Sequence, residues 1–91
     1  MALGKSGIAA AREELNTIGS KVAEARVTND SFIKLYSDVN FQKFVSETDR
    51  GSLINEQLQN LAKWTASMCD TVDNMRKNSE KYLDQQEALN R

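Results

Sequence analysis

The sequence has no proline, no histidine and only four glycines among its 91 residues. Strands of a β-sandwich or barrel need turns roughly every ten residues, and glycine and proline are the residues that usually make them. Their scarcity excludes such folds. The absence of histidine and the single cysteine, Cys69, exclude an internal disulfide and a Cys/His metal site. The composition therefore predicts an all-α protein with no metal.

The sequence also lacks an excess of charge of either sign, because 12 basic residues are balanced by 13 acidic ones to give a net charge of −1. The basic residues are scattered, so we expect no binding to nucleic acid or to an anionic membrane. No apolar run is long enough to span a bilayer, and Met1–Gly7 lacks the apolar core of a signal peptide. We therefore expect no membrane insertion and no cleaved signal peptide.

Two stripes of mostly apolar residues are present, one in each half of the chain. Each alternates spacings of four and three residues, the pattern of helices that pack along a seam. The first stripe runs from Ile8 to Val39 and the second from Ile54 to Leu89. We predict that both stripes meet in one seam, which contains Leu15, Ile18, Val22, Leu58, Leu61, Met68 and Val72.

Turn and capping residues separate the two stripes in the segment VSETDRGSL, residues 45–53. Gly51 could adopt a positive φ, and Ser52 could cap the following helix. We predict a single domain over residues 1–91: an antiparallel two-helix hairpin with arms at about 6–46 and 52–90 and a turn at 47–52. Two readings of VTNDS, residues 27–31, stay open: a continuous helix, or a break after which Asp30 or Ser31 caps a separate helix.

A two-helix hairpin buries one stripe on each helix and leaves other apolar side chains in water. We therefore expect dimerisation or partner binding to complete a four-helix bundle. Cys69 beside the seam is either a small semi-buried residue or the site of a disulfide between two copies. The candidate partner interface consists of Phe41, Phe44, Trp64, Met68, Met75 and Leu83.

Catalysis has no candidate residues in this sequence. There is no Ser–His or Cys–His pair and no glycine-rich phosphate loop, and the carboxylates fall mostly outside the stripes, where a solvated helix face needs them. We predict no enzyme activity, no cofactor and no small-molecule substrate.

The second arm, from Ile54 to Leu89, resembles the second helix of the WXG family of small proteins associated with type VII secretion in Gram-positive bacteria. The chain is most similar to the helical partners of LXG-domain toxins. In that family an aromatic residue followed four positions later by an acid helps to mark a complex for export. Tyr82 matches the aromatic position, whereas Gln86 replaces the acid, and no tryptophan precedes Arg50-Gly51 to form a Trp-x-Gly turn.

The resemblance implies a non-enzymatic adaptor that binds the N-terminal helical domain of a toxin and helps its export. It implies a cytoplasmic location before export and secretion without a cleaved signal peptide. Tyr82 and Gln86 are the candidate export signal, with a purely packing role for Tyr82 as the alternative. The other functions that stay open are a structural coiled-coil subunit of a phage or secretion apparatus and an immunity-type helical protein. The partner is then a toxin, a second small helical protein, or another copy of the chain.

Overall fold

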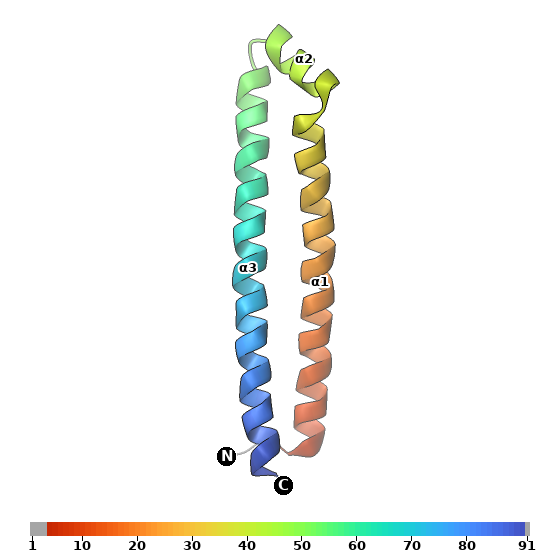
Figure 1. Ribbon diagram of the computed structural model, residues 1–91, viewed down its shortest axis with the longest axis vertical. Helices are drawn as coiled ribbons and strands as arrows, with labels where there is room; N and C mark the ends of the chain where they lie inside the picture. The colour runs from red at the N-terminus through yellow and green to blue at the C-terminus, as the bar shows by residue number, and fades with distance from the viewer. Residues whose placement is uncertain (1–3, 91) are drawn as a thin grey trace. The chain divides into compact units, whose positions relative to one another are not determined.

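The computed structural model of the protein describes residues 4–90. These residues form three helices: α1 (Lys5–Ser37), α2 (Val39–Glu47) and α3 (Gly51–Leu89) (Figure 1). No strand occurs in this described range. The prediction of an all-α fold is confirmed.

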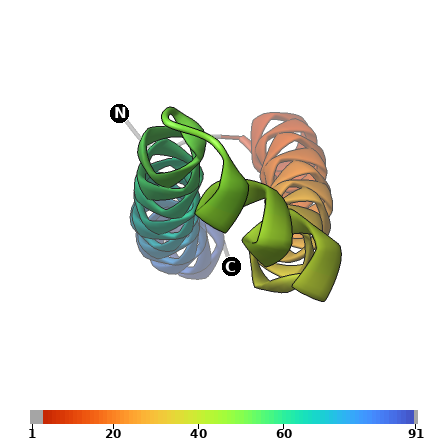
Figure 2. The same ribbon diagram turned by 90° about the horizontal axis from the view of Figure 1, so that it is seen from above.

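The chain divides into two compact units, each containing a segment of α1 and a segment of α3. Unit 1 comprises Met1–Ala23 and Asp70–Arg91, and unit 2 comprises Glu24–Cys69. Within each unit the α1 segment and the α3 segment pack side by side and antiparallel (Figures 1 and 2), which confirms the predicted hairpin topology. In unit 2, the short helix α2 bridges the end of α1 and the start of α3 (Figure 2).

The first arm is interrupted at Asp38, not near Asn29. Helix α1 continues through residues 27–31, so the predicted alternative of a break there is wrong, and so is a single helix from residue 6 to 46. Asp38 has extended backbone angles, φ −68° and ψ 138°. Its carboxylate accepts hydrogen bonds from the backbone N–H groups of Asn40 at 3.0 Å and Phe41 at 3.2 Å. It therefore caps α2, as Asp does at many helix starts.

The turn between α2 and α3 covers only residues 48–50, because α3 begins at Gly51 and not at Ser52. Gly51 does not use a positive φ; no described residue does. A Cβ at Gly51 would lie 2.6 Å from the Val45 Cα atom and 2.8 Å from the Val45 carbonyl oxygen. Glycine is required here because the backbone of Val45 passes so close.

The two units have different cores. In unit 1, Ile8, Leu15 and Leu83 form a buried apolar cluster, with Ala11 packed against it. In unit 2, the buried positions hold the small side chains of Ala62 and Cys69 together with the polar Asn29. The Asn29 Nδ2 atom donates a hydrogen bond to the carbonyl oxygen of Ala62 at 3.0 Å, so the core of unit 2 joins α1 and α3 through a polar contact.

Candidate protein-interaction surface

At three positions of α3, the residue that is buried against α1 is the one that follows the residue predicted for the seam. Ala62, Cys69 and Leu83 are buried, where the periodicity predicted Leu61, Met68 and Tyr82. Leu58 and Val72, which were also predicted for the seam, are partly buried, as expected for residues that lie beside the line of contact with α1. On α1 the predicted residues Leu15 and Val22 are buried, whereas Ile18 is exposed.

Two neighbouring columns of α3 could each have faced α1, and the structure selects the one that contains small residues. Ala62 and Cys69 have smaller side chains than Leu61 and Met68, so they allow closer helix packing in unit 2. On α1, Gly19 provides similar room. A Cβ there would lie 3.3 Å from the Arg76 Nε atom, so the Arg76 side chain packs against this glycine.

Because α3 turns its column of small residues toward α1, the neighbouring line of apolar side chains stays exposed. We call this line the outer stripe. Its members recur every seven residues along the helix, and each side chain is between 40% and 69% exposed. Exposed apolar side chains that repeat at a helical period mark an interaction surface more strongly than scattered ones. The outer stripe consists of Ile54, Leu61 and Met68 in unit 2 and of Met75, Tyr82 and Leu89 in unit 1.

The columns on both sides of the outer stripe carry no charge. Neither of them contains Asp, Glu, Lys or Arg, and neither does the stripe itself. Together the three columns form an uncharged sector of α3, so a partner that docks there does not have to desolvate an ion. One flank consists of Gln57, Trp64, Thr71, Asn78 and Gln85, and the other of Leu58, Thr65, Val72, Ser79 and Gln86.

The ion pairs of unit 1 use other columns of α3. The Arg12 guanidinium donates to Asp84 at 2.8 Å and to Glu87 at 2.7 Å, which links α1 to α3. Within α3, Arg76 pairs with Asp73 and with Glu80, both at 2.9 Å.

These ion pairs also shift the pKa values of their members. The hydrogen bonds that Arg12 donates to Asp84, and then to Glu87, raise the pKa of Arg12. The hydrogen bond from Arg76 lowers the pKa of Asp73, against an opposing effect of burial. These paired charges of unit 1 lie outside the uncharged sector.

The predicted interface residues fall into three places. Met68 and Met75 lie on the outer stripe, and Trp64 lies on its flank with 63% of its surface exposed. Phe41 and Phe44 lie on α2, with their ring centroids 6.0 Å apart. Leu83 is only 3% exposed and belongs to the core of unit 1. Its assignment to the partner interface is therefore corrected, because it lies on the buried column of α3 that faces α1.

The two residues of the candidate export signal point in different directions. Tyr82 is half-exposed on the outer stripe, so it is not part of the buried seam. Gln86 is 9% exposed and thus buried, and its carbonyl oxygen accepts a hydrogen bond from Asn90 Nδ2 at 2.9 Å. A glutamate at position 86 would place a carboxylate in this buried environment, so we expect Gln86→Glu to destabilise unit 1.

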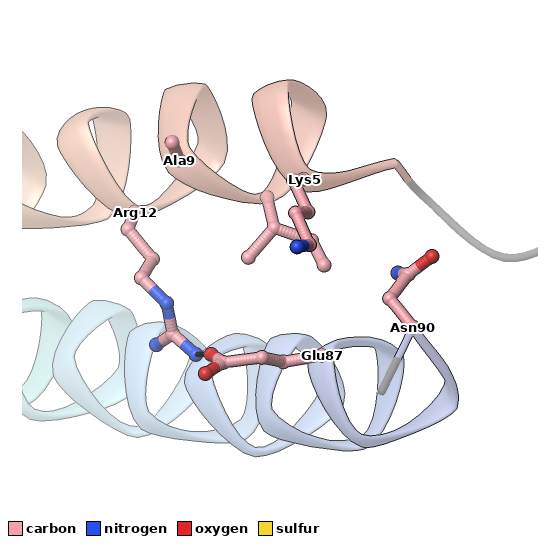
Figure 3. Close-up of a pocket in the computed structure, with 6 residues that line it drawn as sticks. Lys5, Ala9, Arg12, Glu87 and Asn90 are labelled. Carbon is pink, nitrogen blue, oxygen red and sulfur yellow. Dashed lines mark hydrogen bonds and ion pairs between the residues drawn. The ribbon is translucent and has the colours of Figure 1, made fainter.

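A cavity of about 430 Å³ opens at the end of unit 1 (Figure 3). It is lined by Lys5, Ile8, Ala9 and Arg12 from α1, by Glu87 from α3 and by Asn90, which follows the end of α3. In Figure 3 the Arg12 side chain reaches across to Glu87, which it contacts in the ion pair described above. Its lining holds two basic residues, Lys5 and Arg12, and Arg12 is already paired with two carboxylates.

Two asparagines of unit 2 were not recognised from the sequence as structural features. Asn29 is 6% exposed, and its Oδ1 atom has no hydrogen-bond partner; the Oδ1 atom of Asn55 is in the same situation. The one signal in the sequence was the position of Asn29 on the first stripe. Polar residues at such positions specify helix register at a cost in stability.

Among residues 4–90, no group of three or more Cys, Asp or Glu side chains is arranged to hold a metal ion. None of the helices in this range is long and apolar enough to cross a membrane. No protein-family model matches the chain, and no curated protein or solved structure shows a significant match to it. The outer stripe with its uncharged flanks is the best-supported functional surface of the described residues.

Proposed function

We propose that the protein is a non-enzymatic helical adaptor that binds a helical protein partner through the outer stripe of α3. The observation that carries this proposal is the exposed apolar repeat from Ile54 to Leu89, flanked on both sides by uncharged residues. Burying apolar surface contributes about 25 cal/mol per Å², so a helix that covers this stripe gains free energy along its length. A long amphipathic helix is the partner shape that matches such a surface.

The finer proposal comes from the resemblance of α3 to the second helix of WXG-family proteins. We propose that the partner is the N-terminal helical domain of an LXG-type toxin, and that the complex is exported by a type VII secretion system. Tyr82 supports this proposal because it is exposed enough to be read by another protein. The buried Gln86 is not available in the same way, so we assign the recognition role to Tyr82 alone.

Trp64 provides the first test. Its side chain is large, 63% exposed and next to the outer stripe. If it anchors the toxin domain, Trp64→Ala weakens binding by roughly 1–3 kcal/mol without unfolding either unit. The matched control is Asn60→Ala, which changes an exposed residue one turn earlier outside the uncharged sector. Isothermal titration of the purified chain with the toxin's helical domain measures both variants.

Tyr82 provides the test of export. We expect Tyr82→Ala to keep the helical content and to weaken toxin binding modestly, because it removes one of the six side chains of the outer stripe. The amount of toxin in the culture medium should fall by more than this loss of binding explains. Tyr82→Phe keeps the ring and is the control for loss of apolar area. Equal export by wild type and Tyr82→Ala would refute the export-signal role. Loss of helical structure in Tyr82→Ala would instead show that the residue is needed for folding.

A further inference from the structure

We propose that Met75 is a reversible oxidation site, at which a peroxide-class oxidant forms methionine sulfoxide and thereby weakens the binding of a partner to the outer stripe. The site itself is defined by residues of unit 1 and does not depend on the identity of the partner. Its consequence for binding rests on the proposed function, because it requires that a helical partner covers this part of α3.

The sulfur atoms of α3 differ strongly in their exposure to solvent. Residues 4–90 contain the methionines Met68 and Met75 and the cysteine Cys69. Both of these methionines belong to the outer stripe, and they are 44% and 63% exposed, whereas Cys69 is 6% exposed. Oxidation of sulfur depends on access from solvent. Met75 is therefore the sulfur of the described residues that an oxidant reaches most easily.

The surroundings of Met75 in unit 1 can accommodate a polar product. Side chains three and four positions apart are neighbours on a helix, and for Met75 these include Thr71, Asn78 and Ser79. Each of these residues carries a hydroxyl or amide group, and each is exposed. Met75 also lies outside the buried cluster of unit 1. A sulfoxide at position 75 therefore stays hydrated in the free chain, and folding does not have to bury it.

A bound partner changes this situation, because it removes the Met75 side chain from water. The thioether is apolar and adapts to irregular surfaces, which suits an interface. The sulfoxide is polar, and burying its oxygen without a hydrogen-bond donor costs free energy. The outer stripe and its two flanking columns contain no Lys or Arg that could pair with this oxygen. Oxidation of Met75 therefore disfavours binding without disfavouring folding.

The oxidation step transfers one oxygen atom from hydrogen peroxide to the Met75 sulfur. The sulfur lone pair attacks one peroxide oxygen, the O–O bond breaks and the S–O bond forms. The departing hydroxide takes the proton of the transferred oxygen and leaves as water, so that sulfur loses two electrons and peroxide gains them. Methionine sulfoxide reductases reverse the change. In this reduction two thiols become a disulfide and the oxygen leaves as water.

The first experiment maps sulfur oxidation in the full chain during limited treatment with hydrogen peroxide. Peptide mass spectrometry follows each site separately, including Met1, which lies outside the described residues. We expect Met75 to gain one oxygen faster than Met68, while Cys69 stays a thiol. A methionine sulfoxide reductase with dithiothreitol should restore the original mass, and circular dichroism should show the same helical content throughout.

Faster oxidation of Met68 or Cys69 than of Met75 would overturn the proposed site. Loss of helical structure when Met75 is oxidised would show that the residue serves folding, which also overturns the proposal. A product that the reductase does not convert back would refute its reversibility.

The second experiment measures binding of the toxin's helical domain by isothermal titration before and after oxidation. We expect oxidised wild type to bind at least about tenfold more weakly. Met75→Leu removes the sulfur and keeps an apolar side chain of similar volume, so oxidation should change its affinity much less. Met68→Leu is the matched control, in which oxidation should weaken binding as in wild type. Each variant is compared with itself, so a difference in starting affinity does not affect the result.

The outcomes separate this inference from the proposed function. Equal affinity of oxidised and untreated wild type would overturn the control of binding and leave the adaptor role intact. An equal loss in Met75→Leu would place the sensitive sulfur elsewhere and overturn the assignment to Met75. If untreated wild type does not bind the toxin domain, the adaptor role is refuted, and the control of toxin binding is refuted with it. The oxidation site is then decided by the first experiment alone.

Discussion

Units 1 and 2 are built from segments of the same two helices but are held together by different interactions. Unit 1 buries the large apolar side chains of Ile8, Leu15 and Leu83 and adds the ion pairs of Arg12 across the two helices. Unit 2 buries small or polar residues, chiefly Asn29 and Ala62. It also contains α2, which has no buried residue within its nine positions.

The difference indicates that the two units contribute differently to folding and specificity. Large buried side chains stabilise a helix pair through the apolar area that they remove from water. Small side chains remove less area, and a buried asparagine with an unpaired oxygen lowers stability while restricting the register. We therefore expect unit 1 to be the more stable unit in the isolated chain, and unit 2 to gain more from a partner on its part of the outer stripe.

The largest expected effect comes from truncating the core of unit 1. Leu83 is 3% exposed, so Leu83→Ala should lower the free energy of unfolding by about 2–5 kcal/mol through lost burial and the cavity left behind. The matched change is Leu61→Ala in unit 2, where the side chain is 40% exposed and the cost should be less than half as large. Urea unfolding at a protein concentration too low for self-association measures both, and equal costs would contradict the contrast between the buried column and the outer stripe.

Two glycines sharpen the comparison further. Gly51→Ala places a Cβ against the backbone of Val45, which cannot move aside as a side chain can, so we expect a loss of about 1–3 kcal/mol, concentrated in unit 2. Gly19→Ala in unit 1 meets only the flexible Arg76 side chain. Because alanine favours the helix over glycine by up to about 1 kcal/mol, this second variant should be neutral or stabilising. Thermal unfolding that shows the opposite order would refute the assignment of Gly51 to a close backbone approach.

A smaller effect of opposite sign is expected at Asn29. Replacing it by leucine removes an acceptor without a partner from the core of unit 2 and should raise stability by about 1 kcal/mol. Amide hydrogen exchange in residues 24–69 should slow, and that of unit 1 should change less. The control is Asn16→Leu, an exposed change in the same helix. A destabilised Asn29→Leu variant would mean that the hydrogen bond to Ala62 outweighs the unpaired oxygen.

Periodicity predicted the helices and the antiparallel topology because both follow from where apolar residues recur. It did not predict which of two adjacent columns of α3 faces α1. Leu61 and Met68 are more hydrophobic than Ala62 and Cys69, so composition favoured the wrong column. The decision depends on how closely the helices approach, and this depends on facing pairs such as Asn29 and Ala62, which one-dimensional spacing does not contain.

The helix boundaries show the same limit on a local scale. Asp38 is a good capping residue, but so are Asp30 and Ser31, and the sequence does not state which of them ends a helix. At Asp38 the chain turns into α2, and the carboxylate pairs with two backbone N–H groups; at Ser31 the hydroxyl instead donates to the carbonyl of Val27 at 3.3 Å, inside the helix. For the interaction surface, the sequence correctly placed Met68 and Met75 in an apolar repeat, and only the structure shows that their side of the repeat faces outward.

The smallest expected effect is the pH dependence that unit 1 owes to Asp73. The Arg76 hydrogen bond holds the pKa of Asp73 below its ordinary value of 3.8 in the folded chain. A carboxylate with a depressed folded pKa stabilises the fold above its unfolded pKa, and this stabilisation is lost as the pH falls through the folded value. Wild type should therefore lose stability below about pH 4 more steeply than Asp73→Asn, which cannot take up that proton. The control is Asn74→Ser, an exposed change on the same helix that removes no titratable group, so it should leave the steepness as in wild type. Urea unfolding between about pH 2.5 and pH 6 measures the three curves, and parallel curves for wild type and Asp73→Asn would show that the ion pair on α3 adds nothing to the stability of unit 1.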